Sequence, residues 1–431
     1  MTKARKKLSV NEAWEILFSE LSIIERIESD GVFEISSKTI NRYHEARLMA
    51  KFDFRAKRPK IFIEHGLSIL PITTGTYVIG KFHVYEDILY DSKLETIGAN
   101  KLPDHITAID IENISSETTA LLCANACGIL TSFFEEDYIT HVIGGRMRTG
   151  DFRLQLSNVS LSVSSSQIEI DGGFESESCI YLIEVKNLMH DNFLVRQVYY
   201  PYRAWTAKLE EQNIDKKVRN IFLTYSDGDF YLREYEFEQL EKPESIKMVK
   251  EAKYSIIKDS LSLEKLQYIT DNTTIVEDPN SPFPQSDDLN KVINLCELLY
   301  LKNESMTKAE ISEEFGFVIR QASYYGTSTN YLDLTTYEDQ KYNLTKKGEK
   351  IFGLPLQQRQ FELVSLILAH EPFNIVMKDY LQQGERPSTN RIQELIRHCK
   401  LYNVGKETTT FPRRCKTVIS WIDWIFDRVD I

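Results

Sequence analysis

Apolar and polar residues alternate position by position in a segment near the middle of the chain that begins at Gln167, and again at the end of a neighbouring segment, which begins with an apolar run at Ile180. Because successive side chains of a strand point to opposite faces, Asp171 lies on the polar face of the first segment, while Glu184 and Lys186 share one face of the second. The pattern predicts two β-strands. If these strands pair side by side, two carboxylates and one ammonium group meet at one end of a sheet.

Other segments show the longer apolar period of an α-helix, or shorter strand-like alternation. Helices are predicted over residues 9–29, 115–134 and 192–211, with a kink or a restart of the last at Pro201. The glycine-rich segment Gly144–Gly150 is predicted to be a loop. Further strands are predicted over residues 32–35, 69–82, 151–156, 159–163, 218–225 and 230–237.

The last third of the chain is predicted to be mostly helical and follows a proline-rich polar segment, residues 276–288, which has the composition of a linker. Residues 307–316 and 318–325 have the pattern of a helix-turn-helix unit, and residues 332–344 that of a hairpin wing. Other helices are predicted over residues 289–301, 356–382, 389–401 and 412–426, the last two resembling a second such unit.

The formal net charge of −12 argues against general coating of nucleic acid, because phosphate contacts need local positive charge. Basic residues nevertheless concentrate in two stretches, residues 38–60 and 391–416. Two basic islands on an acidic chain are typical of a DNA-binding enzyme whose other surfaces repel DNA. Two ordinary solvated faces would give the same pattern.

Several classes of site have no support in the sequence. The six cysteines are scattered without the spacing of zinc ligands, which favours a reducing cytoplasm. No apolar run approaches the roughly 18 residues of a membrane span. No phosphate-binding Gly-x-x-x-x-Gly-Lys-Ser/Thr motif occurs, so we expect no nucleotide cofactor.

The strongest candidate chemistry is the cluster of Asp171, Glu184 and Lys186. Glu184-Val-Lys186 ends an apolar run, so these charges lie at the edge of a core, where each needs a partner or a task. Two carboxylates and an ammonium can hold a divalent cation, orient a phosphodiester and lower the pKa of a water nucleophile. The spacing alone is common, since Glu251-Ala-Lys253 shares it. A lysine–glutamate pair that caps a sheet end is the alternative.

The candidate residues lie in three stretches, Gln167-x-Glu-x-Asp171, Ile183-Glu184-Val-Lys186 and Arg196-Gln197. Together these stretches resemble the PD-(D/E)XK nuclease superfamily, and the whole arrangement resembles a bacterial type II restriction endonuclease. The sequence departs from one branch of that superfamily, because Pro201 stands four residues after Gln197 where a tyrosine would follow. Ile170, and not a proline, precedes Asp171.

The resemblance implies a Mg²⁺-dependent, sequence-specific endonuclease that cuts double-stranded DNA to 5′-phosphate and 3′-hydroxyl ends within a restriction-modification system. Asp171 and Glu184 would bind the metal, Glu169 would be a weaker ligand, and Lys186 would assist the attacking water. A cognate DNA methyltransferase is an expected partner. A palindromic site would favour a homodimer, whereas several recognition modules would also allow a monomer on an asymmetric site.

We therefore expect an α+β or α/β protein with a restriction-endonuclease-like mixed sheet, flanked by helices, over residues 106–275. Residues 1–105 would be an N-terminal DNA-recognition region, residues 276–288 a linker, and residues 289–431 a mostly helical, winged-helix-like domain. The predicted DNA contacts are Arg47, Lys51, Arg55, Arg146, Arg148, Arg196, Gln197, Arg320, Gln321, Arg413 and Arg414.

Two other functions stay open at this point. A non-enzymatic regulator would bind DNA through the helix-turn-helix pattern and use the charged cluster only as a structural salt bridge. A nuclease of the same fold could instead act on modified or branched DNA, because the fold does not determine the substrate.

Overall fold

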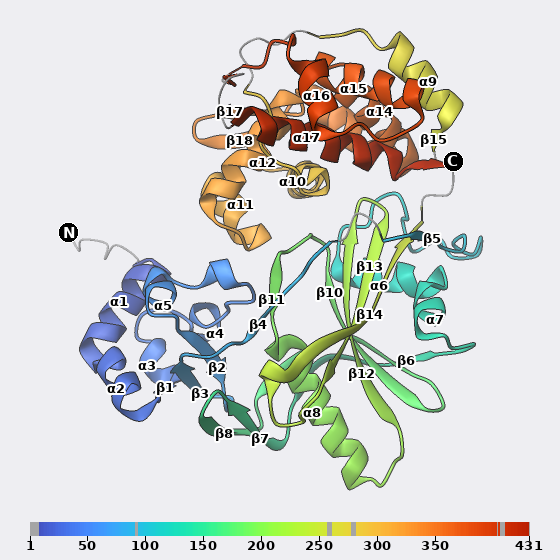
Figure 1. Cartoon of the computed structure of the whole chain (residues 1–431). Coiled ribbons are helices and arrows are strands. Elements are labelled where there is room, and N and C mark those ends of the chain that lie inside the picture. Colours follow the sequence, from blue (N-terminus) through green and yellow to red (C-terminus); the bar gives the residue numbers. More distant parts are fainter. Residues whose placement is uncertain are drawn as a thin grey trace, which may run out of the picture.

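The computed structural model describes residues 8–90, 94–256, 261–276, 282–402, 404–405 and 410–430. The chain forms three segments that pack against one another (Figure 1). We call residues 8–80 the N-terminal segment, residues 81–256 the central segment and residues 261–430 the C-terminal segment. None of the described helices is long and apolar enough to cross a membrane.

The central segment is built on a seven-stranded mixed sheet with the strand order β5-β14-β13-β12-β10-β9-β6. β10 pairs in parallel with β12 and antiparallel with β9. This confirms the predicted α+β class with a central mixed sheet and helices. The elements are β4 (Tyr85–Asp87), β5 (Thr96–Gly98), α6 (Glu117–Ala126), α7 (Ile129–Phe134), β6 (Thr140–Arg148), β7 (Asp151–Leu156), β8 (Val159–Ser164), β9 (Gln167–Glu175), β10 (Cys179–Lys186), β11 (Asn192–Leu194), α8 (Arg196–Glu211), β12 (Lys217–Ser226), β13 (Asp229–Phe237) and β14 (Ile246–Ser255).

Helices cover both faces of this sheet (Figure 1). Apolar side chains of α8 pack on one face against Leu182 and Phe222, whereas those of α6 and α7 pack on the other against Ile183 and Val185. Every residue of β10 is therefore buried. A strand covered on both sides is expected to be a continuous apolar run, which explains why Ile180–Ile183 shows little alternation.

Three sequence predictions of local structure were wrong. The segment Gly144–Gly150 is not a loop, because most of it belongs to β6, an edge strand paired with β9. The pairing shifts register near Gly145, whose φ of +86° marks a bulge that glycine accommodates. The long predicted helices are interrupted, the first at Ser22 (φ 48°) and the second at Gly128 (φ 71°).

The N-terminal segment packs short helices around a three-stranded sheet of order β1-β3-β2. Its core is aromatic: the rings of Trp14 and Phe62 lie 4.9 Å apart, edge to face. Its elements are α1 (Val10–Leu21), α2 (Ile23–Asp30), β1 (Val32–Ser36), α3 (Ser37–Ile40), α4 (Ala46–Met49), a 3-10 helix η1 (Arg55–Lys57), α5 (Lys60–Glu64), β2 (Ser68–Pro71) and β3 (Thr76–Gly80).

The C-terminal segment is mostly helical, as predicted, with a small sheet of order β16-β18-β17. Part of the predicted linker, residues 277–281, lies outside the described residues, but Ser286 packs on this segment, where its carbonyl accepts a hydrogen bond from Trp421 Nε1 at 2.9 Å. The elements are β15 (Leu261–Ser262), α9 (Leu263–Asn272), α10 (Leu289–Lys302), β16 (Met306–Thr307), α11 (Lys308–Phe315), α12 (Ile319–Tyr331), β17 (Thr335–Glu338), β18 (Lys341–Leu344), α13 (Lys346–Phe352), α14 (Leu356–Leu368), α15 (Glu371–Gln383), α16 (Thr389–Ile396), α17 (Thr410–Phe426) and β19 (Val429–Asp430).

All three segments meet at His190, which follows β10. Its ring stacks on Phe54 of the N-terminal segment with centroids 3.7 Å apart. Its Nδ1 lies 2.7 Å from the carbonyl oxygen of Phe315 in the C-terminal segment. Burial lowers the pKa of His190 to about 3, so the imidazole is neutral at physiological pH. We call this contact the His190 junction.

A substitution at the neighbouring Gly316 should test the His190 junction. A Cβ at Gly316 would lie 2.5 Å from the Phe54 ring, and the residue has φ +67°. Gly384 has the same φ but open space around it. We expect Gly384→Ala to cost about 1 kcal/mol from backbone strain alone, and Gly316→Ala to cost clearly more in urea unfolding. Equal losses of unfolding free energy in the two variants would show that the Phe54 ring can move away from the added Cβ at no cost in stability.

Buried charges make a second contact between the central and C-terminal segments. Arg359 Nη2 on α14 lies 2.7 Å from Asp227 Oδ1, in the turn after β12, and 3.0 Å from Glu297 Oε1 on α10. Burial raises the pKa of Glu297 to about 7, although the Arg359 guanidinium opposes the shift. We call these three residues the Arg359 network.

The pKa of Glu297 predicts a pH dependence of stability. Because the folded-state pKa lies above the ordinary value of 4.5, the folded protein holds the proton more tightly than the unfolded chain. As the pH rises from about 4.5 to about 7, the stability of the wild type relative to Glu297→Gln should therefore fall, by at most about 1.4 kcal/mol per pH unit. Above about pH 7 the difference should stay level. Urea unfolding of both proteins across this range measures the difference, and a constant difference would contradict the prediction.

Candidate functional site

The residues predicted to carry the chemistry lie together where the pairing of β9 with β10 ends, near the last residue of β10. The two strands pair antiparallel, and the last paired residues are Ile183 and Gly172. Asp171 follows just beyond this pair. Its Oδ2 accepts a hydrogen bond from the backbone N–H of Val185 at 2.8 Å, which directs the carboxylate toward the end of β10. The predicted juxtaposition of Asp171 with Glu184 and Lys186 is thus present.

Lys186 lies at the centre of this group. Its Nζ donates to Glu184 Oε1 at 2.5 Å and to the carbonyl of Val185 at 3.0 Å. It also lies 3.6 Å from Glu117 Oε1, in the first turn of α6. No local sequence pattern identifies Glu117, because it lies far upstream on a helix and approaches Lys186 only through the packing of that helix against the sheet.

Gln197 also belongs to this group. Its Nε2 donates to Glu184 Oε1 at 2.5 Å, while its own Oε1 is buried and has no hydrogen-bond partner. This side chain, predicted as a DNA contact, is therefore placed against the carboxylate of Glu184. A buried acceptor without a partner costs free energy, so its presence here favours a ligand or water in the same space.

The cluster holds three carboxyl groups and one ammonium, so full ionisation of all three carboxyl groups is unfavourable. Burial raises the pKa of Glu184 to about 8, and the nearby carboxylate of Asp171 adds to the shift although Lys186 opposes it. Burial would lower the pKa of Lys186, but the charges of Glu184, Glu117 and Asp171 outweigh burial and raise it. Three carboxylates share one ammonium, so a further cation would relieve their repulsion.

No group of three or more His, Cys, Asp or Glu side chains within the described ranges is already arranged as a metal cage. The ammonium of Lys186 contacts both Glu184 and Glu117, in the space between them. The donor set still fits a hard divalent cation, which prefers carboxylate and amide oxygens. Asp171, Glu184, Glu117 and the unpartnered Oε1 of Gln197 supply such oxygens once the ammonium moves aside.

One of the predicted DNA contacts, Lys51, lies near this cluster, and two others lie beside Tyr77 of the N-terminal segment. Lys51 is close enough for its charge to lower the pKa of Glu117, against the larger effect of burial. Arg47 and Arg196 both lower the pKa of Tyr77, again against burial. These three cations come from the N-terminal segment and from the start of α8.

Other predicted contacts already have partners. Arg55 Nη1 pairs with Asp87 at 2.7 Å, and Arg146 Nε lies 3.4 Å from Glu169 Oε2 across β6 and β9. Both Glu169 and Arg146 are 55% exposed. Arg148 Nη1 donates to Ser165 Oγ at 3.3 Å. These pairs are exposed, so a phosphate could compete for the arginines.

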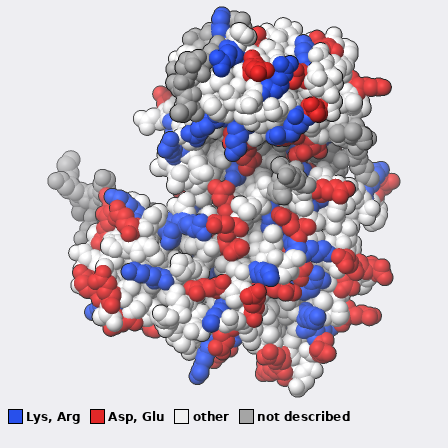
Figure 2. All heavy atoms as spheres, in the orientation of Figure 1, with Lys and Arg blue, Asp and Glu red and all other residues white. Residues whose placement is uncertain are grey.

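The predicted contacts of the C-terminal segment differ in exposure. Arg320 is exposed and donates to the Tyr324 hydroxyl at 2.5 Å, whereas Gln321 accepts from the Val318 N–H at the start of α12. Arg413 is exposed, but Arg414 is buried, and burial lowers its pKa. Figure 2 shows acidic and basic side chains interspersed on the viewed face, with several Lys and Arg along the lower edge of the C-terminal segment.

Comparison with known proteins divides the chain as its fold does. Residues 11–79 match a family described as domain of unknown function DUF6996, residues 80–255 match DUF6997, and residues 291–430 match DUF7226. No curated protein and no solved structure matches the chain. The chain is therefore similar, segment by segment, to three domain families of unknown function.

Proposed function

We propose that this protein is a Mg²⁺-dependent endonuclease that cuts double-stranded DNA at specific sequences. The observation that carries the proposal is the convergence of Asp171, Glu184 and Lys186 with Glu117 at the end of the central sheet. Buried carboxylates in excess over cations are costly unless they serve a bound cation. A phosphodiester beside such a cation is a substrate for hydrolysis.

Each residue has a defined part in this proposal. Asp171, Glu184 and Glu117 would hold Mg²⁺, which when bound supplies a Lewis acid and lowers the pKa of a water. Lys186 would place a positive charge beside the attacking water and the phosphoryl oxygens. Gln197 would fix the orientation of Glu184 through the 2.5 Å hydrogen bond. Arg47, Lys51 and Arg196 would contact the DNA backbone.

Features of the flanking segments support a DNA substrate. The C-terminal segment has the element order helix α10, strand β16, helices α11 and α12, and hairpin β17–β18. This is the order of a winged helix, and α12 would be its recognition helix. The central segment, with its carboxylates on β9 and β10 between helices, agrees with a restriction-endonuclease-like core. A cognate methyltransferase and a homodimer on a palindromic site extend the same proposal.

A direct test is to incubate the purified protein with unmethylated phage DNA in Mg²⁺ or in EDTA and to separate the products on a gel. Discrete Mg²⁺-dependent fragments are expected. A smear would keep the nuclease and remove the sequence specificity. Intact DNA in every lane would contradict cleavage of ordinary duplexes, and the same assay on methylated and branched DNA would then decide between those substrates and no nuclease at all.

One observation favours the non-enzymatic alternative. The ammonium of Lys186 already contacts Glu184 and Glu117, as it would in a purely structural salt bridge. A regulator of this kind should bind DNA equally well with and without divalent cations. A nuclease should bind more tightly when Ca²⁺ offsets the repulsion between its carboxylates and the phosphates.

Addition of Ca²⁺ alone should also stabilise the protein. Because the cation binds the folded carboxylate cluster and not the unfolded chain, unfolding free energy should rise by about 2.7 kcal/mol at a hundredfold excess over Kd. Thermal melts in CaCl₂ and in KCl of equal ionic strength measure the effect. The rise should be lost in Glu117→Gln, and an equal rise in that variant would place the bound cation elsewhere.

A further inference from the structure

A cavity of about 900 Å³ lies at the end of the central sheet opposite the carboxylate cluster. We propose that it binds an extended peptide segment of another protein, which inserts as a short strand between β12 and β13. The cavity is lined by Cys179 at the start of β10, whereas Glu184 and Lys186 lie near the end of the same strand. This inference is independent of the nuclease proposal.

The two strands that border the cavity separate there. β12 and β13 pair from Ser226 back to Asn220, which is opposite Tyr235, and the pairing stops at that point. Lys217–Arg219 continue along β10 alone, while Glu236 and Phe237 continue along β14 alone. The sheet therefore forks. Within the part of the chain that the structure describes, each branch has one edge without a strand partner, and such edges bind extended chains through main-chain hydrogen bonds.

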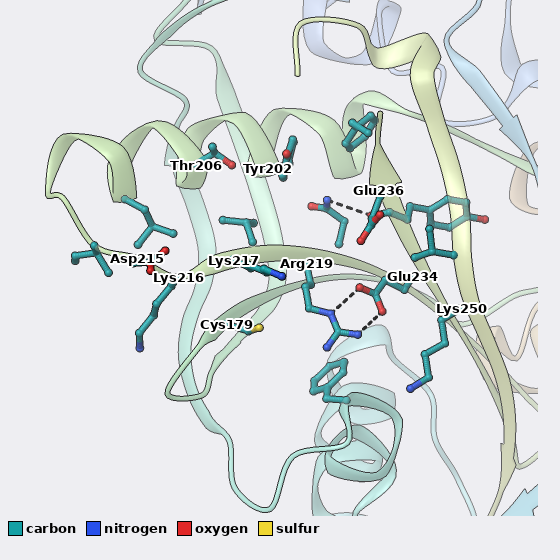
Figure 3. A pocket seen from close by; sticks show the side chains of 18 of the residues that line it. Cys179, Tyr202, Thr206, Asp215, Lys216, Lys217, Arg219, Glu234, Glu236 and Lys250 are labelled. Atoms are coloured by element: carbon teal, nitrogen blue, oxygen red, sulfur yellow. Dashed lines mark hydrogen bonds and ion pairs between the residues drawn. The ribbon is translucent and has the colours of Figure 1, made fainter. Parts of the chain in front are cut away.

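The two faces of the fork differ in polarity. On the α8 side the cavity is lined by apolar and aromatic residues such as Tyr202, Leu209 and Val218. On the other side Arg219 binds Glu234 through two hydrogen bonds of 2.6 and 2.5 Å. Figure 3 shows this pair, with Lys250 on the neighbouring strand and Tyr202 on α8. A strand in the fork would alternate side chains between these faces, so its sequence should alternate apolar and charged residues.

Two buried polar side chains of the lining are incompletely hydrogen-bonded. Asn220 is 1% exposed; its Nδ2 donates a long hydrogen bond of 3.4 Å to the Tyr235 carbonyl, but its Oδ1 has no partner. Oγ1 of Thr206, on α8, is also buried and makes no well-directed hydrogen bond, although it lies beside the Tyr202 hydroxyl. Both residues line the same cavity. A peptide unit offers the matching groups, an N–H for Asn220 and a carbonyl for Thr206.

Charge favours a peptide over a phosphorylated ligand. The lining contains five acidic side chains, Glu135, Glu210, Asp215, Glu234 and Glu236, and four basic ones, Lys216, Lys217, Arg219 and Lys250. Among them Lys250 pairs with Glu135 and Arg219 with Glu234. A nearly balanced set offers no surplus of positive charge to a phosphate, but it suits a segment that carries side chains of both signs.

The test uses a phage-displayed library of random nonapeptides, selected on the immobilised full-length protein. The same selection is run on Asn220→Leu and Thr206→Val, which remove these two polar groups. Glu211→Gln, on an exposed position of α8 outside the lining, is the matched control. The wild type and the control should enrich peptides with alternating apolar and charged residues. Affinity of synthetic copies should fall roughly tenfold in each cavity variant.

Stability provides a second readout. If Asn220 serves a ligand, Asn220→Leu should melt at the same temperature as the wild type or higher, because it replaces a buried acceptor without a partner. If Asn220 is structural, the melting temperature should fall. No enrichment on the wild type, equal binding by both cavity variants, or enriched peptides without the alternation would each overturn the proposal. Slower amide exchange at Val218 and Phe237 with peptide bound would support insertion between the strands.

Discussion

Replacement of Glu184 by glutamine should abolish DNA cleavage while the protein stays folded and binds DNA. The substitution keeps the shape of the side chain and the hydrogen bond from Gln197, but it removes a charge from the carboxylate cluster. Without that charge the cluster would hold a divalent cation and its water poorly, and we expect the cleavage rate to fall by at least about 10³-fold. Single-turnover cleavage of a defined DNA fragment measures the loss.

Glu169→Gln is the matched control for this experiment. Glu169 lies on β9, the strand next to that of Glu184, but it is half exposed and pairs with Arg146. If it is only a surface charge, its variant should cleave at nearly the wild-type rate. A loss comparable to that of Glu184→Gln would make Glu169 a metal ligand, as the sequence resemblance implies. Wild-type cleavage by Glu184→Gln would remove the assignment of the site, whatever the control shows.

Replacement of Arg359 by methionine should destabilise the protein by about 3–5 kcal/mol. The change leaves the side chains of Asp227 and Glu297, 1% and 14% exposed, without their cation. An uncompensated buried carboxylate costs more than the lost attraction, because it must either stay charged in a poor solvent or take up a proton. Urea unfolding followed by the tryptophan fluorescence of the C-terminal segment, which contains Trp421 and Trp424, should show the shift.

Two further variants give this prediction its controls. Arg386 pairs with Asp423 at 2.7 Å, but the two side chains are 54% and 28% exposed, so Arg386→Met should cost at most about 1 kcal/mol. Combining Arg359→Met with Asp227→Asn and Glu297→Gln removes all three charges and should restore much of the lost stability. Equal effects of the two single variants would show that burial of the Arg359 network adds nothing.

Sequence periodicity predicted the strands of the site well, because their alternation follows from the two faces of a sheet. Residues 167–171 and 180–186 lie in β9 and β10, and these strands do pair. The glycines of Gly144–Gly150 predict a turn, but in the structure they accommodate a bulged edge strand. Nor does a helical period reveal a break such as that at Ser22, where one residue adopts the left-handed conformation.

The partners of the site residues were less predictable than the residues themselves. Glu117 approaches Lys186 because α6 docks against the sheet, and that docking depends on apolar contacts spread along the chain. Gln197 has the residue type of a DNA contact, but the close approach of α8 to β10 directs it toward Glu184. Such contacts depend on how elements pack, which no local pattern determines.

The His190 junction also has a consequence for the exchange of segments between homologous proteins during evolution. Phe54, His190 and Phe315 fall in three different family matches, yet they form one contact. A segment exchanged for a homologous one from another protein would bring a junction residue shaped for different neighbours. We therefore expect the three families to occur together in one chain and to be inherited as one gene. Chimeras that combine segments from different proteins should need compensating changes at Phe54, His190 or Gly316.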